Sequence, residues 1–280
     1  MSREPQRTAT AATRRTPSLA PLFATPALLF VAFVIVPLGA LAYRAAHDGV
    51  VPEQLRAEFV FDALRLSLIT STLTLVLALA LGTPLAYLLA RASFTGRQIV
   101  DTLVDLPMVL PPTVAGVALL VAFGRRGVFG PLLEPAGIEL AFTTTAVVMA
   151  QLFVSAPFLV RSLKAGFEAL DQTYEQVSAT LGVSPLRTFW RITLRLSRPA
   201  LVGGAVLCWA RALSELGATL IFAGNFPGRT QTMPLAIITA FESSVGLSGA
   251  IALAVILLLV ALALLLALRF ALRRLPPFEL

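Results

Sequence analysis

Two ionisable residues, Arg211 and Glu215, stand four positions apart in an otherwise apolar stretch of the chain. A spacing of four places both side chains on one face of a helix. Ionisable groups at membrane depth are costly, so they normally pair with each other or face water. The pattern allows two interpretations. One is a structural ion pair; the other is an anion path in which Arg211 supplies positive potential and Glu215 keeps binding weak enough for release.

Covalent and metal chemistry have almost no candidates in this chain. One His, His47, and one Cys, Cys208, exclude a disulfide within the chain and argue against the usual zinc and Ser–His sites. We therefore expect no catalytic residue and no metal site. No Gly-rich loop is followed by a Lys–Ser/Thr pair, and Lys164 is the only lysine, so any ATP and Mg²⁺ must be bound by another chain.

A proline-rich stretch contains Pro107, Pro111 and Pro112 and continues into Thr113. Each proline removes a backbone donor, so carbonyl groups about one turn earlier in a helix lose their partners. Inside a membrane those carbonyls need water, side chains or neighbouring helices. The stretch predicts a kinked helix that either faces a pore or packs against the rest of the protein.

The composition indicates an integral membrane protein. Hydrophobic residues make up 57% of the 280 residues and charged residues only 13%, with a mean hydropathy of +0.85, whereas soluble domains are about a quarter charged. Six apolar segments are each long enough to cross about 30 Å of hydrocarbon as a helix. We therefore expect an all-α membrane bundle of six transmembrane helices, at Leu19–Ala42, Leu64–Leu89, Val100–Phe123, Leu140–Val160, Ala200–Phe222 and Ser248–Leu268.

The distribution of basic residues predicts the orientation. If all six segments span, most of the 22 Lys and Arg residues lie on the side of the N-terminus, which the positive-inside rule places in the cytoplasm together with the C-terminus. The net charge of +7 reflects this bias and not a nucleic-acid partner. Residues 1–18 are expected to be a disordered tail near anionic lipid, residues 19–274 the membrane domain and residues 275–280 a short tail. Cleavage of the first segment as a signal peptide is the alternative, but it would invert the charge bias.

The longest cytoplasmic connection on this count runs from Arg161 to Arg198. Glu168–Leu181 contains neither Gly nor Pro, Gly182 offers a helix end, and Ser184-Pro185 is typical of a new helix start. The segment is expected to form two short helices at an angle, the second of them amphipathic. From the residues alone, a simple connector at the membrane surface remains an alternative to a docking element.

The spacing in this segment resembles the cytoplasmic "EAA" loop of ABC importer permeases. Gln176, Val177 and Ser178 occupy the Glu-Ala-Ala places, and Gly182 matches the family's Gly. Ile192 and Leu194 match the later apolar pair, while Arg195 stands where Pro is usual. The resemblance implies that a short helix docks on the ATPase subunit and couples ATP hydrolysis to transport. The residues assigned to this loop are Glu168, Glu175, Gln176, Val177, Ser178, Ala179, Gly182, Ser184, Pro185, Arg187, Ile192 and Leu194.

Two further stretches, Asp105–Gly116 and Arg211–Asn225, resemble the molybdate, tungstate and sulfate permeases of that family. The resemblance implies alternating access for a tetrahedral oxyanion, with molybdate or tungstate expected ahead of sulfate or thiosulfate. It also implies four kinds of partner: ATPase subunits, an extracytoplasmic oxyanion-binding protein, a second permease chain in a homodimer, and the lipids of a bacterial inner membrane. The residues assigned to the path or gate are Pro107, Pro111, Pro112, Thr113, Arg211, Glu215 and Asn225.

Two other classes of function are weakly supported by the residues. A stand-alone secondary transporter predicts ionisable relays in several spans, whereas here Arg211 and Glu215 lie within one span and Asp101 and Asp105 near the start of another. A membrane-embedded enzyme predicts clustered His, Asp or Cys, which the chain does not offer.

Overall fold

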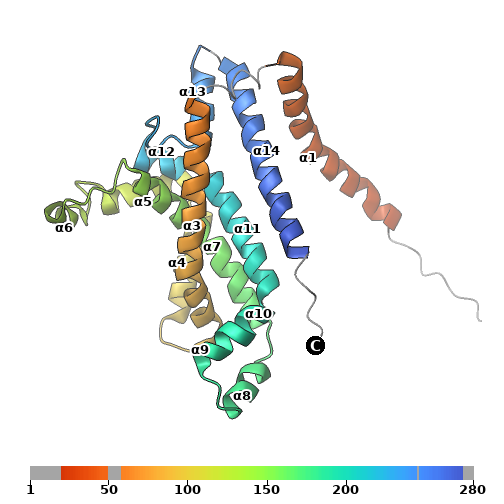
Figure 1. Ribbon diagram of the computed structural model, residues 1–280, viewed down its shortest axis with the longest axis vertical. Helices are drawn as coiled ribbons and strands as arrows, with labels where there is room; N and C mark the ends of the chain where they lie inside the picture. The colour runs from red at the N-terminus through yellow and green to blue at the C-terminus, as the bar shows by residue number, and fades with distance from the viewer. Residues whose placement is uncertain (1–19, 50–57, 245, 274–280) are drawn as a thin grey trace, which may run out of the picture.

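The computed structural model describes residues 20–49, 58–244 and 246–273, and within them it is helical with no strand (Figure 1). The predicted tails, residues 1–18 and 275–280, lie outside the described residues. The helices are α1 (Ala20–Asp48), α3 (Glu58–Arg91), α4 (Arg97–Val109), α5 (Pro112–Phe123), α6 (Gly130–Leu133), α7 (Thr144–Glu168), α8 (Thr173–Thr180), α9 (Pro185–Thr188), α10 (Leu194–Leu196), α11 (Arg198–Leu213), α12 (Gly217–Ala223), α13 (Met233–Glu242) and α14 (Gly246–Arg273). A 3₁₀ turn covers Glu134–Ala136, and a π-helical turn covers Phe189–Thr193.

Four of the described helices, α1, α3, α7 and α14, are long and apolar enough to cross a membrane, and a fifth span results if the bent pair α4 and α5 is counted as one. The predicted count of six transmembrane helices is not exactly reproduced, because two of the six predicted segments are not single continuous helices. The third segment breaks between α4 and α5, and the fifth breaks between α11 and α12. The all-α membrane fold is confirmed, because every predicted apolar segment is helical over most of its length.

The centre of the molecule is formed by α3, α7 and α11, which run side by side in Figure 1. Leu89 of α3, Leu163 and Phe167 of α7, and Cys208 of α11 are fully buried in one apolar cluster. At the crossing of α7 and α11, a Cβ added to Gly204 would lie 2.7 Å from the Cβ of Ser162. The two backbones approach this closely because the position is glycine, which is how transmembrane helices gain van der Waals contact.

Polar groups also join α3 to α7 inside this bundle. The Gln151 Nε2 atom donates to Thr70 Oγ1 at 3.2 Å, and Thr74 Oγ1 donates to Gln151 Oε1 at 3.1 Å. All three side chains are buried. Such hydrogen bonds between transmembrane helices contribute about 0.6–2 kcal/mol each, so Gln151 helps to fix the register of α3 and α7 in the buried part of the bundle.

The short apolar helix α13 packs into the bundle at the end opposite α8 (Figure 1). Met233, Ala236 and Ala240 of α13 are buried with Val60 of α3 and Leu253 of α14. In contrast, α1 touches the rest of the chain mainly through Leu41 and Ala45, which pack on α14. Most of the described part of α1 is thus left exposed to its surroundings.

Candidate functional site

The proline-rich stretch produces a sharp bend and not a mild kink. The axes of α4 and α5 differ by 118°. Leu110 has φ −66° and ψ 136°, and Pro111 has φ −54° and ψ 137°, so both are extended. The ring of a proline disfavours the helical conformation of the residue before it. Pro111 acts in this way on Leu110, and Pro112 acts in this way on Pro111. The predicted kink is confirmed, and Pro107 is accommodated inside α4.

Arg211 and Glu215 do form a pair, but not on one helix face. Helix α11 ends at Leu213, and Glu215 lies in the break before α12. Arg211 Nη1 is 2.8 Å from Glu215 Oε2, while Glu215 Oε1 accepts a hydrogen bond of 2.8 Å from the amide of Ala218. The Glu215 side chain is fully buried and that of Arg211 is 26% exposed. The carboxylate therefore serves both as the partner of Arg211 and as a cap on α12.

The two bends lie against each other. A Cβ added to Gly217 would be 2.9 Å from Pro112 Cβ, and one added to Gly116 would be 2.9 Å from the carbonyl oxygen of Ala218. Glycine at both positions is what allows α5 and α12 to approach this closely. The residues predicted for a path, Pro111, Pro112 and Thr113 on one side and Glu215 on the other, are thus brought to one region by neighbouring breaks in two spans.

Asn225 belongs to a separate hydrogen-bonded turn at the start of the connection to α13. Its Nδ2 donates to Thr239 Oγ1 at 2.9 Å, and its Oδ1 accepts from Gln231 Nε2 at 3.0 Å. Gly224, directly before it, has φ +75°, a conformation that favours glycine. These contacts tie the turn to α13, so Asn225 is a structural part of this turn whatever its role in a gate.

At the opposite end of the molecule, α8 and α9 form the predicted pair of short helices. Gly182 has φ +73°, and the amides of Gly182 and Val183 donate to the carbonyls of Ala179 and Ser178 at 3.0 and 3.1 Å. This is the Schellman pattern of helix termination. Ser184 then precedes α9, and Pro185 occupies its first position. The predicted break at Gly182 is confirmed, whereas Glu168 belongs to α7 and not to the helix that carries Gln176.

The two short helices are held together and to the bundle by side-chain contacts. The hydroxyls of Ser178 and Thr188 are 2.7 Å apart and buried. Glu175 accepts a hydrogen bond of 2.7 Å from Thr193 Oγ1 and lies 3.5 Å from Arg91 Nε at the end of α3. Asp171 caps the start of α8, and hydrogen bonds from the Thr173 amide and hydroxyl lower the pKa of its carboxyl group.

Most side chains of α8 and α9 are exposed. The large exposed apolar side chains of these helices, of the turn between them and of the π-helical turn that follows are Tyr174, Val177, Leu181, Leu186 and Trp190. Gln176, Ala179 and Arg187 are exposed as well, whereas Ile192 is half-buried and Leu194 packs against the core. Large exposed apolar patches on a folded chain mark interaction sites. The predicted loop residues therefore divide into an exposed set and an anchoring set.

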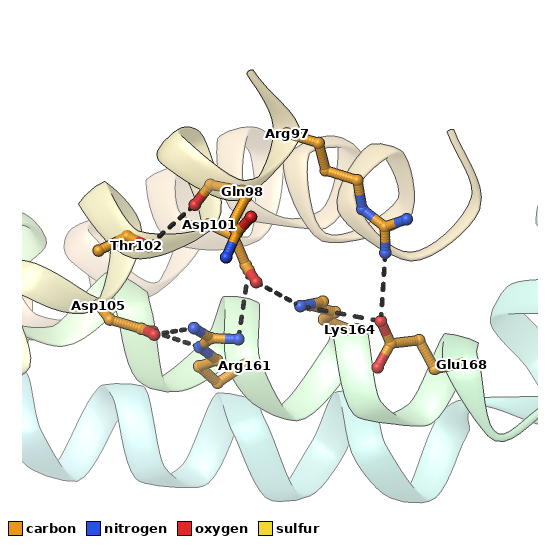
Figure 2. Close-up of polar contacts among 8 residues, drawn as sticks. All are labelled: Arg97, Gln98, Asp101, Thr102, Asp105, Arg161, Lys164 and Glu168. Carbon is orange, nitrogen blue, oxygen red and sulfur yellow. Dashed lines mark hydrogen bonds and ion pairs between the residues drawn. The ribbon is translucent and has the colours of Figure 1, made fainter. Parts of the chain in front are cut away.

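A cluster of charges between α4 and α7 was not singled out from the sequence (Figure 2). Arg161 pairs with Asp105 and lies 3.2 Å from Asp101, and Lys164 Nζ is 2.7 Å from the other Asp101 oxygen. Glu168 lies 3.6 Å from Arg97 and 3.8 Å from Lys164. The signal was available: Asp101 and Asp105 are four apart on α4, and Arg161 and Lys164 are three apart on α7.

The overall fold of this chain, apart from any single site in it, is shared with chains of bacterial ABC importers. A bacterial ABC transporter involved in the import of the acidic polysaccharide alginate has a chain that superposes with a TM-score of 0.74 at 17% identity, covering 92% of this chain and 97% of that one. A chain of the MetNI methionine ABC transporter superposes with a TM-score of 0.60 at 14% identity, covering 78% and 97%. The helices of this chain thus have the fold found in ABC importers, with several helices long and apolar enough to cross a membrane.

The chain belongs to the family of binding-protein-dependent transport system inner membrane components, which it matches over residues 82–275. It is therefore a transport subunit and not an enzyme, and ATP hydrolysis is the task of a separate chain. The molybdenum transport system permease protein ModB of Mycobacterium tuberculosis is 44% identical over 80% of this chain and 86% of its own. The protein of the same name from Escherichia coli is 41% identical over 70% and 86%, and the molybdate/tungstate transport system permease protein WtpB of Thermococcus kodakarensis is 37% identical over 84% and 88%.

Proposed function

We propose that this chain is the permease of an importer that carries molybdate or tungstate into the cytoplasm. The observation that supports this most directly is the identity of 44% to a molybdenum permease across four fifths of the chain. Sulfate is the second candidate cargo, because the sulfate transport system permease protein CysW of Synechococcus elongatus is 34% identical over 77% of this chain. Molybdate, tungstate and sulfate are all tetrahedral dianions, so the same path geometry suits each of them.

In this proposal the exposed face of α8 and α9 docks on an ATPase subunit that binds ATP and Mg²⁺. The apolar side chains of Val177, Leu181 and Leu186 supply a surface for burial. The Schellman turn at Gly182 holds α8 and α9 at a fixed angle, so a displacement of the ATPase is passed to α7 and α11. A second copy of the chain and an external oxyanion-binding protein complete the assembly.

The path is proposed to run beside the two bends, where Arg211 offers positive charge to the anion. Glu215 neutralises part of this charge, which suits transport because cargo held too tightly would not be released. The alternative for Arg211 and Glu215 is a purely structural pair. Alternating access then consists of two arrangements of the bundle, stabilised in turn by the binding protein and by the ATPase.

The test is reconstitution of the chain in vesicles with the ATPase and the secreted binding protein of its own transport system, which we expect to be encoded by neighbouring genes. We expect ATP-dependent uptake of molybdate into the vesicles and no uptake when the ATPase carries a substitution that abolishes hydrolysis. Calorimetry of the binding protein with molybdate, tungstate and sulfate identifies the cargo. Sulfate binding far tighter than molybdate would overturn the cargo assignment, and a permease that co-purifies with no ATPase in mild detergent would overturn the importer itself.

A further inference from the structure

Helix α4 is a rigid segment between two joints. At its start, Gly96 has φ +89°, and at its end the chain turns sharply at Leu110 and Pro111. None of its residues is fully buried, although Val100 and Val104 pack partly against the central core. A helix bounded in this way can change its angle without unfolding, because the backbone changes are confined to its ends.

Ion pairs add to the apolar packing of Val100 and Val104 in fixing the angle of α4. Asp101 and Asp105 face α7, and Asp101 lies between Arg161 and Lys164 (Figure 2). The side chain of Asp101 is 25% exposed, that of Arg161 34% and that of Lys164 11%. The whole cluster contains three acidic and three basic residues and is therefore electrically balanced. Partly buried pairs with several partners are held more firmly than isolated surface pairs.

A second group of polar contacts, at the end of α7, leads from the cluster to α8. Glu168 is the last residue of α7 and the partner of Arg97 at the start of α4. Two residues later, the carbonyl of Leu170 accepts a hydrogen bond of 3.1 Å from Arg91 Nη2, and Arg91 also pairs with Glu175 of α8. The ends of α3 and α7, the start of α4 and the helix α8 are thus connected by two groups of charged and polar contacts, which are linked to each other by the backbone from Glu168 to Leu170.

We infer that Asp101 and Asp105, held by Arg161 and Lys164, are positioning residues that make α4 move with the end of α7 when the α8–α9 pair is displaced. In this way a movement at the ATPase end reaches the bend at Pro111, next to Glu215 and the proposed path. This role rests on the proposed function, because it assigns a task within the transport cycle. Arg161 and Lys164 act here through α4 and do not contact cargo.

The first experiment measures molybdate imported per ATP hydrolysed by the reconstituted complex. Asp101→Asn removes the carboxylate that bridges Arg161 and Lys164 but keeps the size of the side chain. We expect this variant to bind the ATPase and to hydrolyse ATP, while the ratio of molybdate to ATP falls roughly fivefold or more, in the range of ordinary coupling between sites. The matched control is Asp48→Asn, which breaks the exposed pair with Arg44 at the end of α1 and should leave the ratio unchanged.

The second experiment replaces the ionic contact by a covalent one. Asp101→Cys and Lys164→Cys are combined with Cys208→Ser, and the two cysteines are joined with a short bifunctional maleimide. The ratio of molybdate imported to ATP hydrolysed should be low before cross-linking and should recover afterwards, because in this proposal the only function of the cluster is to connect α4 to α7. If Asp101→Asn fails to assemble, the cross-linked variant still tests whether the connection between α4 and α7 is needed for coupling.

An unchanged ratio in Asp101→Asn, or a low ratio that cross-linking does not raise, would overturn the role of the cluster. A wild-type complex that hydrolyses ATP but imports no oxyanion would instead overturn the proposed function, and with it this role. The two failures are therefore distinguished by the wild-type measurement.

Discussion

At the scale of single residues, burial decides what Glu215 can do. Its side chain is fully buried, and an ionised carboxylate in that position is tolerated because Arg211 and the Ala218 amide both contact it. Arg211 is partly exposed, so it is the member of the pair that an anion in the path can reach. In both interpretations Glu215 is held by Arg211 and by the Ala218 amide, and they differ in whether Arg211 also acts on an anion.

Replacing Arg211 with Gln is expected to leave a buried carboxylate without its charged partner. The free energy of unfolding should fall by about 1–3 kcal/mol, seen as a lower midpoint of thermal unfolding in detergent, and uptake should fall with it. The double variant Arg211→Gln with Glu215→Gln should regain stability, since the Gln side-chain oxygen still accepts from the Ala218 amide.

Uptake by this double variant separates the two interpretations. If Arg211 acts on the anion, uptake stays low although stability has returned. If the pair is structural, uptake returns together with the unfolding midpoint, and unchanged uptake in Arg211→Gln alone would likewise exclude a part in the path.

At the scale of elements, the α8–α9 pair shows how local backbone chemistry builds a surface. The Schellman turn at Gly182 and the proline start at Pro185 fix the angle between the helices, and the Ser178–Thr188 contact fixes their spacing. The exposed apolar side chains are then held in place by these local contacts and by the packing of Phe189 and Leu194 on the core. The shape of this surface depends on a positive φ that only a few residue types adopt readily.

Gly182→Pro should abolish ATP-driven uptake. Proline is locked near φ −65° and has no amide hydrogen, so it cannot adopt the observed φ of +73° or donate to Ala179. Uptake in vesicles and co-purification of the ATPase measure the effect. Gly182→Asn is the matched control, because Asn adopts the left-handed conformation at small cost, and it should keep most of the uptake. Full uptake by Gly182→Pro would show that the turn is not part of the coupling.

At the scale of the whole molecule, the breaks in two spans bring distant stretches together. The chain around Pro112 meets the chain around Gly217 through positions where only glycine fits. Arg161 and Lys164 contribute to the charge bias from which the sequence predicts the membrane orientation. In the structure they also hold helices together, because they form ion pairs with Asp101 and Asp105. The same two basic residues thus contribute both to the positive-inside bias and to the ionic cluster.

The proposed orientation predicts which positions a membrane-impermeant maleimide can label in intact cells. Cys208 is the only cysteine and is buried, so the native chain should give no background. Val128→Cys, in the exposed loop after α5, should be labelled from outside, whereas Arg187→Cys on α9 should be labelled only after the membrane is opened. The reverse pattern would place the termini outside and would contradict the docking of α8 and α9 on a cytoplasmic ATPase.

Most of the fold and one of the two functional regions could be predicted from the sequence. Apolar length predicts helices because a membrane leaves no other partner for the backbone, and Gly182 with Pro185 predicts a break because both act through their own φ angles. The resemblance of the segment around Gln176 and Gly182 to the importer loop also needs only local spacing, and the match of the chain to that family agrees with it.

Only the tertiary structure decided how the breaks are used. No local sequence pattern predicts that the third span turns by 118°, that α11 ends before Glu215, or that Asp101 contacts Lys164 of another helix. These features depend on contacts between residues far apart in the chain. The free-energy cost of burying a charge or of interrupting a helix is offset there by an ion pair, a hydrogen bond or packing with a neighbouring helix. Sequence alone therefore determined the class of this protein and the position of its loop, while the packing of α4, α5 and α12 decided which residues stand together.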